Sequence, residues 1–236
     1  RPTQGPVTAT VVFLNSGSEH HAGPGRAWVE LSRRLAAAGH SAIRVNFRGW
    51  GESPDEGYAP GRPYDPHTVD DTRSIVTALH KRGDRTIVLV GLCAGAWVAL
   101  RRCKTLPLSG VVAFNPQLYW QPGDPVYATI SEGVAWLHAK TRNDPTWVES
   151  TKRVCQRWLD DICRTPYPVD FWFARNDPGM LYLEDVLDRV SLDGHLMGSL
   201  SIRELPNLDH AMHLQWHRAE AFEAVSAMLK RIARAK

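Results

Sequence analysis

Five short apolar runs, rich in β-branched residues, set the strongest constraint on how this chain can fold. They occupy residues 8–14, 42–47, 86–90, 110–114 and 169–174. Runs of this kind are hydrophobic on both faces, which is typical of strands in a parallel sheet that is covered by helices on both sides. The chain is therefore expected to place a sheet between two helical layers.

Segments with helical periodicity lie between the apolar runs. Apolar residues recur at spacings of three or four in residues 28–35, 69–79, 94–103 and 222–232, and glycines at 39 and 83 end the first two patterns. Strands that alternate with helices, joined by right-handed crossovers, predict an α/β fold with a doubly wound, mostly parallel sheet.

One long stretch, residues 115–164, interrupts this alternation. It has no strand pattern, and it concentrates large aromatic residues among prolines and glycines: Tyr119, Trp120, Tyr127, Trp136, Trp147 and Trp158. Structureless loops of this length are uncommon in compact domains. We therefore predict a helical cap at residues 115–164 over a site, inserted into a core formed by residues 1–114 and 165–236. The alternative is a part of the core whose pattern is hard to read.

The composition excludes several classes of protein. Of 236 residues, 43% are hydrophobic and 22% are charged, which excludes a disordered chain. The longest apolar run, residues 86–100, is interrupted by Gly91 and Gly95, so no membrane span is expected. The 28 basic and 25 acidic side chains are spread along the chain, and the basic cluster at residues 230–236 is typical of a last helical turn. We therefore expect no nucleic-acid partner.

The four cysteines, at positions 93, 103, 155 and 163, have neither C-x-x-C spacing nor the density of a disulfide scaffold. This usage predicts a reducing compartment, and hence a cytoplasmic protein. The first residues, Arg1 to Pro6, carry no leader pattern and are rich in proline and glycine, which is typical of a processed chain or an excised domain.

Residues 88–97 carry the most informative motif. A buried run leads into Gly91-Leu92-Cys93-Ala94-Gly95 and then into a helical pattern. This is G-x-C-x-G where a nucleophile elbow carries G-x-S-x-G, a strained strand-to-helix turn that needs small residues two positions to either side of the nucleophile. The motif predicts Cys93 as a nucleophile at the carboxyl edge of the sheet. The alternative is a structural cysteine, since free cysteines are among the most buried residues.

The same turn predicts the electrostatics of the site. Cys93 and the N–H of Ala94 would lie at a helix N-terminus, whose partial positive charge favours a thiolate and an oxyanion. A second oxyanion N–H is expected from the loop after the first strand, at residues 13–19. We assign it to Gly17, with Ser16 or Ser18 as alternatives.

A nucleophile of this kind requires an acid and a base, which follow it in that order along the chain. Asp177 comes soon after the run at 169–174 and is the predicted acid, although an Asp before Pro is also ordinary turn chemistry. His210 lies on the loop after a further strand at residues 200–205 and is the predicted base. His213 is the competitor, and it is disfavoured because we expect it to lie along the last helix.

Histidines at positions 210, 213 and 217 also have the spacing of one helix face, which invites interpretation as a zinc site. No H-E-x-x-H pattern accompanies them, and metal ligands need convergent geometry with supporting hydrogen bonds. We therefore predict neither a metal nor a cofactor. The adjacent His20 and His21 are interpreted as solvated loop residues.

Taken together, these segments resemble the α/β-hydrolase superfamily over almost the whole chain. The segment from Asn46 to Ser53 is similar to the D-x-R-G-x-G-x-S loop that follows the second parallel strand in that superfamily, with Asn46 in place of the usual Asp. The resemblance implies that Arg48, Gly49, Gly51 and Ser53 are structural residues of a tight loop.

The motif combination resembles a narrower group, the cysteine-bearing hydrolases that accompany exosortase systems. More distantly it is similar to dienelactone hydrolases and to thioesterase domains of assembly-line synthases. The motifs are Asn15-x-Gly17, His21-x-Gly-Pro24, Arg48-Gly-x-Gly51 and Gly91-x-Cys-x-Gly95. The resemblance implies a nucleophile, acid and base at Cys93, Asp177 and His210, with oxyanion N–H groups from Ala94 and Gly17.

Thiol chemistry narrows the expected reaction. A cysteine paired with imidazole is a strong nucleophile, and its attack on an acyl thioester exchanges one thioester for another, whereas attack on an ordinary ester runs uphill. We therefore expect a thioesterase that releases its acyl group to water or an acceptor, with a substrate carried by coenzyme A or a carrier protein. The alternatives are a carboxylesterase or lactone hydrolase with the same residues, and a non-catalytic ligand-binding module on the same fold.

Overall fold

A seven-stranded sheet forms the centre of the molecule. The computed structural model describes residues 8–17, 19–58, 63–101, 104–118, 145–188, 192–213, 215 and 218–235. The strands in this part of the chain are β1 (Thr10–Phe13), β2 (Ser41–Arg44), β3 (Ile87–Leu92), β4 (Gly110–Phe114), β5 (Val169–Ala174), β6 (His195–Met197) and β7 (Leu200–Leu205). They lie in the order β2-β1-β3-β4-β5-β7-β6, and every neighbouring pair is parallel except β6 and β7. The predicted α/β fold with a doubly wound, mostly parallel sheet is confirmed.

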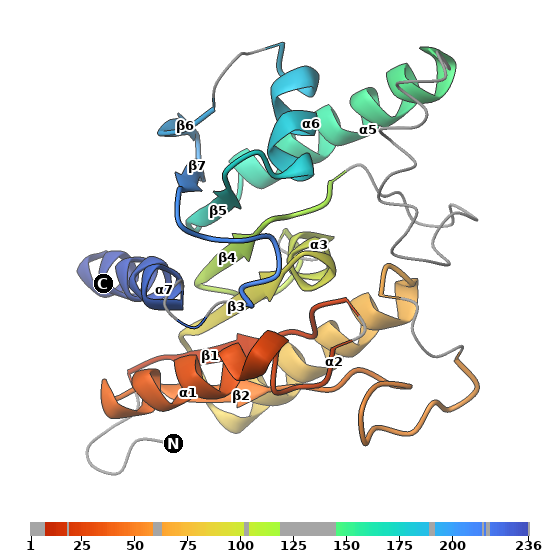
Figure 1. The fold of residues 1–236 in the computed structure, drawn as a ribbon. Coiled ribbons are helices and arrows are strands. Elements are labelled where there is room, and N and C mark those ends of the chain that lie inside the picture. The colour runs from red at the N-terminus through yellow and green to blue at the C-terminus, as the bar shows by residue number, and fades with distance from the viewer. Residues whose placement is uncertain are drawn as a thin grey trace.

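Helices cover the sheet on both faces (Figure 1). They are α1 (Ala27–Ala37), α2 (Pro66–Arg82), α3 (Ala94–Arg101), α5 (Pro145–Cys163), α6 (Pro178–Val186) and α7 (Arg218–Arg234), and a short 3-10 helix, η1 (Pro24–Arg26), precedes α1. Gly83 follows α2 with a φ of 103°, a left-handed cap that glycine adopts without strain. Among the described residues, no helix is long and apolar enough to cross a membrane.

Two elements produce no recognisable sequence pattern. Helix α6 is nine residues long and begins directly after Asp177, in a stretch that has the composition of a turn. Strand β6 is a three-residue edge strand with partly exposed side chains. Periodicity is detectable only over longer windows, so neither element gives a signal.

Each buried strand divides its side chains between two hydrophobic clusters. In β1, Val11 and Phe13 belong to the cluster that includes α1 and α7, whereas Val12 belongs to the cluster that includes α2 and α3. Strand β3 repeats the alternation with Val88 and Leu89. Successive strand side chains point to opposite faces. The continuous apolar runs of the sequence therefore reflect a sheet that is buried on both sides.

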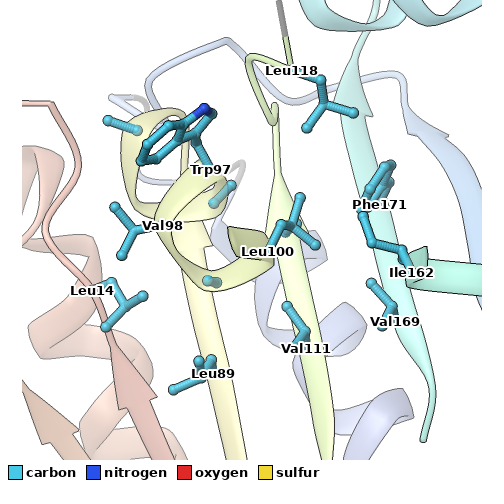
Figure 2. Close-up of a cluster of buried hydrophobic side chains, with 14 of the residues drawn as sticks. Leu14, Leu89, Trp97, Val98, Leu100, Val111, Leu118, Ile162, Val169 and Phe171 are labelled. Carbon is cyan, nitrogen blue, oxygen red and sulfur yellow. The ribbon is translucent and has the colours of Figure 1, made fainter. Parts of the chain in front are cut away.

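The cluster beneath α3 and α5 is the one drawn in Figure 2. Trp97 of α3, Ile162 of α5 and Phe171 of β5 all belong to it. The guanidinium of Arg101 lies over the rings of Trp97 and Trp158, 4.6 and 3.9 Å from their centroids. Cation–π contacts thus join α3 to α5 at the edge of the apolar cluster.

The predicted cap is only partly covered by the described residues. Residues 119–144, with Tyr119, Trp120, Tyr127 and Trp136, lie outside them, as does the side chain of Trp147. Helix α5 corresponds to the end of the cap range, and it buries Cys155, Leu159 and Ile162 in the same cluster as β5. The boundaries of the cap stay a prediction.

Strand β3, helix α3 and the loop after β1 meet in a very close backbone approach. A Cβ placed on Gly91 would lie 2.2 Å from the carbonyl carbon of Gly95, and one placed on Gly95 would lie 2.4 Å from the carbonyl oxygen of Asn15. Neither glycine has a positive φ. The fold therefore requires the absence of a side chain at these positions, not the backbone freedom of glycine.

Gly95→Ala should lower the free energy of unfolding by about 3 kcal/mol, because the new methyl group has to displace backbone atoms. Gly39→Ala is the matched control: a Cβ there meets open space, and only its φ of 88° opposes the change, at a cost of about 1–2 kcal/mol. Urea denaturation measures both. A Gly95→Ala protein no less stable than Gly39→Ala would contradict the steric explanation.

Candidate active site

Cys93 lies at the turn between β3 and α3 with the backbone strain that the elbow motif predicts. Its φ is 53°, in the left-handed region that residues with a side chain rarely adopt. The Cys93 N–H donates to the Phe114 carbonyl at 2.9 Å, and the Cys93 carbonyl accepts from the Trp97 N–H at 3.1 Å. The side chain is partly exposed, which does not fit a structural cysteine of the interior.

Asp177 uses its two carboxylate oxygens for two contacts. It is the N-cap of α6, where Oδ1 accepts from the Gly179 N–H at 2.8 Å, and the same oxygen accepts from Gln117 Nε2 at 3.1 Å. The other oxygen, Oδ2, lies 2.5 Å from His210 Nδ1. The carboxylate is fully buried. The turn chemistry and the contact with a histidine therefore coexist in one side chain.

His210 joins Asp177 to Cys93. Burial works against the charged imidazole, but hydrogen bonds to Asp177 and Cys93, together with the charges of these two groups, outweigh it and raise the pKa of His210 to about 10. The His210 side chain is 42% exposed, so the site is open to solvent. The ring is thus paired with a carboxylate through Nδ1, and the sulfur of Cys93 contributes to the raised pKa of His210.

His213 lies apart from this constellation. The last helix, α7, begins after it, so the expectation that His213 lies along that helix is wrong. Its N–H donates to the Asp209 carboxylate at 3.0 Å, and its side chain is 64% exposed. His217 lies outside the described residues. Of the two candidate bases, His210 is the one that contacts Asp177.

A buried arginine secures the loop that carries His210. The Arg218 guanidinium donates to the His213 carbonyl at 3.1 Å and pairs with Glu30 of α1 at 3.0 Å. Gly25 provides the space, since a Cβ there would lie 2.5 Å from the Arg218 Nη2. The histidine loop is thereby tied to the start of α7 and to α1.

The N–H of Ala94 lies at the start of a helix, and its assignment to the oxyanion stays a prediction. Ala94 is the first residue of α3, and the N–H groups of a first helical turn have no partner within the helix. The loop after β1 comes close to this turn, because the carbonyl of Asn15 lies against Gly95.

Asn15 also sets the shape of the loop that supplies the second N–H. Its Oδ1 accepts from the Phe47 N–H at 2.9 Å, which links the loops after β1 and β2. Gly17 follows with a φ of 51°, and Ser16 is buried, whereas Ser18 lies outside the described residues. The assignment to Gly17, with Ser16 as the alternative, stays a prediction.

The loop after β2 has the structural role that the resemblance implies. Arg48 donates to Asp71 through its side chain at 2.7 Å and through its N–H at 2.9 Å. The Ser53 hydroxyl donates to the Asn46 carbonyl at 3.0 Å. Gly51 has a φ of 51°, and a Cβ there would lie 2.5 Å from Asn46 Nδ2. These residues hold a tight loop together.

His20, His21 and Glu52 are the described residues whose ligand atoms lie close enough to hold a metal ion, all within 4.8 Å. Hydrogen bonds already link these three side chains to each other and to neighbouring groups. His20 Nδ1 accepts from the Ala22 N–H at 3.1 Å, which leaves the ring proton on Nε2, 2.7 Å from Glu52 Oε1. Asn46 Nδ2 lies 3.1 Å from His21 Nδ1 and donates to Glu52 at 2.6 Å. The expectation that the two histidines are merely solvated is therefore wrong, because they belong to a polar network.

Asn115 is a residue of the site that the sequence patterns do not identify. It directly follows β4, it is fully buried and its φ is 46°. Its Oδ1 accepts from the Ala174 N–H at 2.7 Å, and its Nδ2 donates to the His210 carbonyl at 2.8 Å. One side chain thus links the ends of β4 and β5 to the histidine loop. The sequence signal that could identify Asn115 is a polar residue directly after a buried strand.

A parallel sheet with a strained elbow after β3, and with an Asp and a His on the loops after β5 and β7, is the arrangement of an α/β hydrolase. The chain matches the model of the alpha/beta hydrolase family over residues 11–225. It belongs to this family.

Solved structures with the same fold include an esterase of Pyrococcus furiosus, which is 19% identical with a TM-score of 0.65 and matches over 95% of this chain and 83% of its own. A proline iminopeptidase of Mycobacterium smegmatis is 15% identical with a TM-score of 0.62, over 99% and 93%. A lipase-esterase related protein of Clostridium acetobutylicum is 16% identical with a TM-score of 0.61, over 94% and 95%. At these identities the likeness concerns the fold alone. No curated protein sequence matches the chain significantly.

Asn115→Gly tests the link between the strands and the histidine loop. Glycine tolerates the left-handed backbone, so the variant loses only the side-chain hydrogen bonds, and we expect a loss of about 2 kcal/mol in unfolding free energy together with lower turnover. Asn115→Ala adds the backbone strain and should cost about 1 kcal/mol more. Urea denaturation measures the unfolding free energy of each variant, and an assay of hydrolase activity measures its turnover. Unchanged stability and turnover in Asn115→Gly would refute the anchoring role.

The titration of His210 tests its contact with the sulfur. In the parent protein the ring should keep its proton until about pH 10. In Cys93→Ala the hydrogen bond and the charge of the sulfur are gone while burial remains, so the pKa of His210 should fall. NMR of the imidazole C–H protons follows the change, with His195 of β6 as the internal reference. A His210 pKa equal in both proteins would rule out the contact.

Proposed function

We propose that this protein is a thioesterase of the α/β-hydrolase type, with Cys93 as nucleophile, His210 as base and Asp177 as acid. The observation that carries the proposal is the histidine, because one imidazole pairs with the buried carboxylate of Asp177 at 2.5 Å and its pKa is raised by the sulfur of Cys93 as well. A nucleophile needs this arrangement. A protein that only binds a ligand on the same fold does not require an imidazole between a carboxylate and a thiol.

In the first half-reaction the Cys93 thiolate attacks the acyl carbon of the thioester. The negative charge moves to the carbonyl oxygen, where the N–H groups of Ala94 and Gly17 stabilise it. When the tetrahedral intermediate collapses, the bond to the leaving sulfur breaks, and that sulfur takes the proton of the His210 imidazolium. The products are an acyl-cysteine and a free thiol.

In the second half-reaction His210 works as a base. Acylation removes the negative charge of Cys93 and so one of the two partners that raise the pKa of His210. The ring, neutral after the first half-reaction, takes a proton from water while the water oxygen attacks the acyl carbon. The carbon–sulfur bond then breaks, Cys93 leaves as a thiolate, and the acyl group departs as an acid. An acceptor nucleophile in place of water would give acyl transfer.

Thioesters suit this nucleophile better than oxygen esters. Transfer from one sulfur to another changes the bond energy little, whereas an oxygen ester is more stable than the acyl-cysteine that it would form. A substrate carried by coenzyme A or a carrier protein fits this chemistry. A carboxylesterase or lactone hydrolase with the same three residues is the second candidate, and it is favoured by the esterases among the similar structures.

The remaining parts of the proposal concern the cap and the compartment. An aromatic-rich cap at residues 115–164 would enclose an apolar acyl chain above the core of residues 1–114 and 165–236. Cys93, Cys155 and Cys163 are free thiols. A thiol nucleophile must stay reduced, which supports a reducing compartment such as the cytoplasm.

Intact-mass analysis tests the proposal directly. After incubation with acyl-CoA thioesters or p-nitrophenyl esters, the protein should gain one acyl group at Cys93, and the thioester should react with the larger kcat/KM. Cys93→Ala should lose the adduct and about a thousandfold or more of kcat. Cys163→Ser, which removes another partly exposed thiol, is the control that should keep both. Absence of any adduct would favour the binding module.

Replacement of Cys93 by Ser separates the two enzymatic candidates. A serine hydroxyl at the same position is a weaker nucleophile than a thiolate and forms a more stable acyl-enzyme, so thioester turnover should fall, whereas oxygen esters, whose transfer to Cys93 runs uphill, should be affected less. Parallel kcat/KM measurements on one thioester and its oxygen-ester analogue give the ratio. If Cys93→Ser turns over thioesters as well as the parent does, the thiol argument fails.

A further inference from the structure

A tyrosine hydroxyl contacts the sulfur of Cys93. The Tyr64 hydroxyl lies 3.6 Å from Cys93 Sγ, within hydrogen-bond distance for sulfur. The Tyr64 side chain comes from the segment just before α2, and only 8% of the residue is exposed. Neither the elbow motif nor the resemblance singles out this residue, and the mechanism above does not use it.

The position of this hydroxyl is well defined by its surroundings. The ring of Tyr64 packs edge-on against Trp97, with centroids 5.4 Å apart and planes at 89°. Trp97 is fully buried in α3, the helix that begins directly after Cys93. The next residue, Asp65, is the N-cap of α2 and accepts from the His67 N–H at 3.1 Å. Packing and capping therefore hold the phenol and the sulfur in a fixed relation.

A phenol in this position distinguishes between the two protonation states of the cysteine. A neutral thiol is a weak acceptor, whereas hydrogen bonds to an ionised acceptor are about twice as strong as neutral ones. The bond from Tyr64 is therefore strongest when Cys93 carries a negative charge. That charge is present before the attack and develops again when Cys93 leaves the acyl-enzyme.

Tyr64 and His210 contact the same sulfur in different ways. His210 gives its proton to the leaving thiol, so it is neutral when the acyl-enzyme breaks down. Tyr64 donates a hydrogen bond without giving up its proton, and it is available in both half-reactions.

We propose that Tyr64 is a further catalytic residue, whose hydroxyl donates a hydrogen bond to the Cys93 thiolate and stabilises it both as nucleophile and as leaving group. This inference rests on the proposed function, in which Cys93 is the nucleophile. No bond other than this hydrogen bond forms or breaks at Tyr64.

Tyr64→Phe tests the proposal because it removes the hydroxyl and keeps the ring against Trp97. Alkylation of Cys93 by iodoacetamide is followed across pH by peptide mass mapping, and the ultraviolet absorbance of the thiolate is recorded against Cys93→Ala. The variant should shift the midpoint of both curves upward by about one pH unit, so that the alkylation rate at any pH well below the midpoint falls about tenfold. The acylation rate with a thioester should fall by about the same factor.

Tyr182→Phe is the matched control. Tyr182 is a fully buried tyrosine whose hydroxyl lowers the pKa of another cysteine, Cys155, although burial outweighs it and raises the pKa of that thiol to about 12. The variant removes a buried phenol hydroxyl beside a cysteine outside the site. It should leave both Cys93 curves unchanged.

The outcomes separate this inference from the proposed function. If Tyr64→Phe leaves the midpoint unchanged while His210→Ala shifts it, Tyr64 has no such role and the proposed function stands. A lower alkylation plateau with the same midpoint would mean that Tyr64 affects only access to the sulfur, which also overturns the inference. If Cys93 of the parent neither alkylates faster than an ordinary thiol nor forms an acyl adduct, the proposed function fails as well.

Discussion

Helix α3 lies so close to strand β3 that Gly91 cannot carry a side chain, and so close to the loop after β1 that Gly95 cannot carry one either. The chain therefore turns sharply from the strand into the helix between these two glycines. Cys93 lies in this turn and adopts a strained backbone, with a φ of 53°. A side chain on this turn projects from the carboxyl edge of the sheet. The close packing of α3 therefore explains why the sulfur is partly exposed and why it lies beside a helix N-terminus.

The other groups reach the sulfur because parallel strands end at one edge. Asp177 follows β5 and His210 follows β7, and these two strands are neighbours in the sheet. Buried polar side chains hold the loops in place: Asn115 links β4, β5 and the histidine loop, and Arg218 links that loop to α1. The loops of the site are thus held by hydrogen bonds from buried side chains, which are stronger there than at an exposed surface.

The patterns of the sequence predict most of the fold and a smaller part of the site. Both hydrophobic faces of the sheet can be read from continuous apolar runs, whereas α6 and β6 are too short to show periodicity. The elbow motif identifies Cys93 because its requirement for small residues is local. The expectation that His213 lies along the last helix is wrong, because that helix begins only at Arg218.

The sequence by itself determined the alternation of the longer strands and helices and the strained turn at Cys93, because these depend on periodicity and residue size over a few positions. Only the tertiary structure decided which histidine meets Asp177, and that Asn115 and Tyr64 reach the site. These contacts join residues that lie 29 to 95 positions apart. They depend on how the ends of strands line up across the sheet, and no local pattern carries that information.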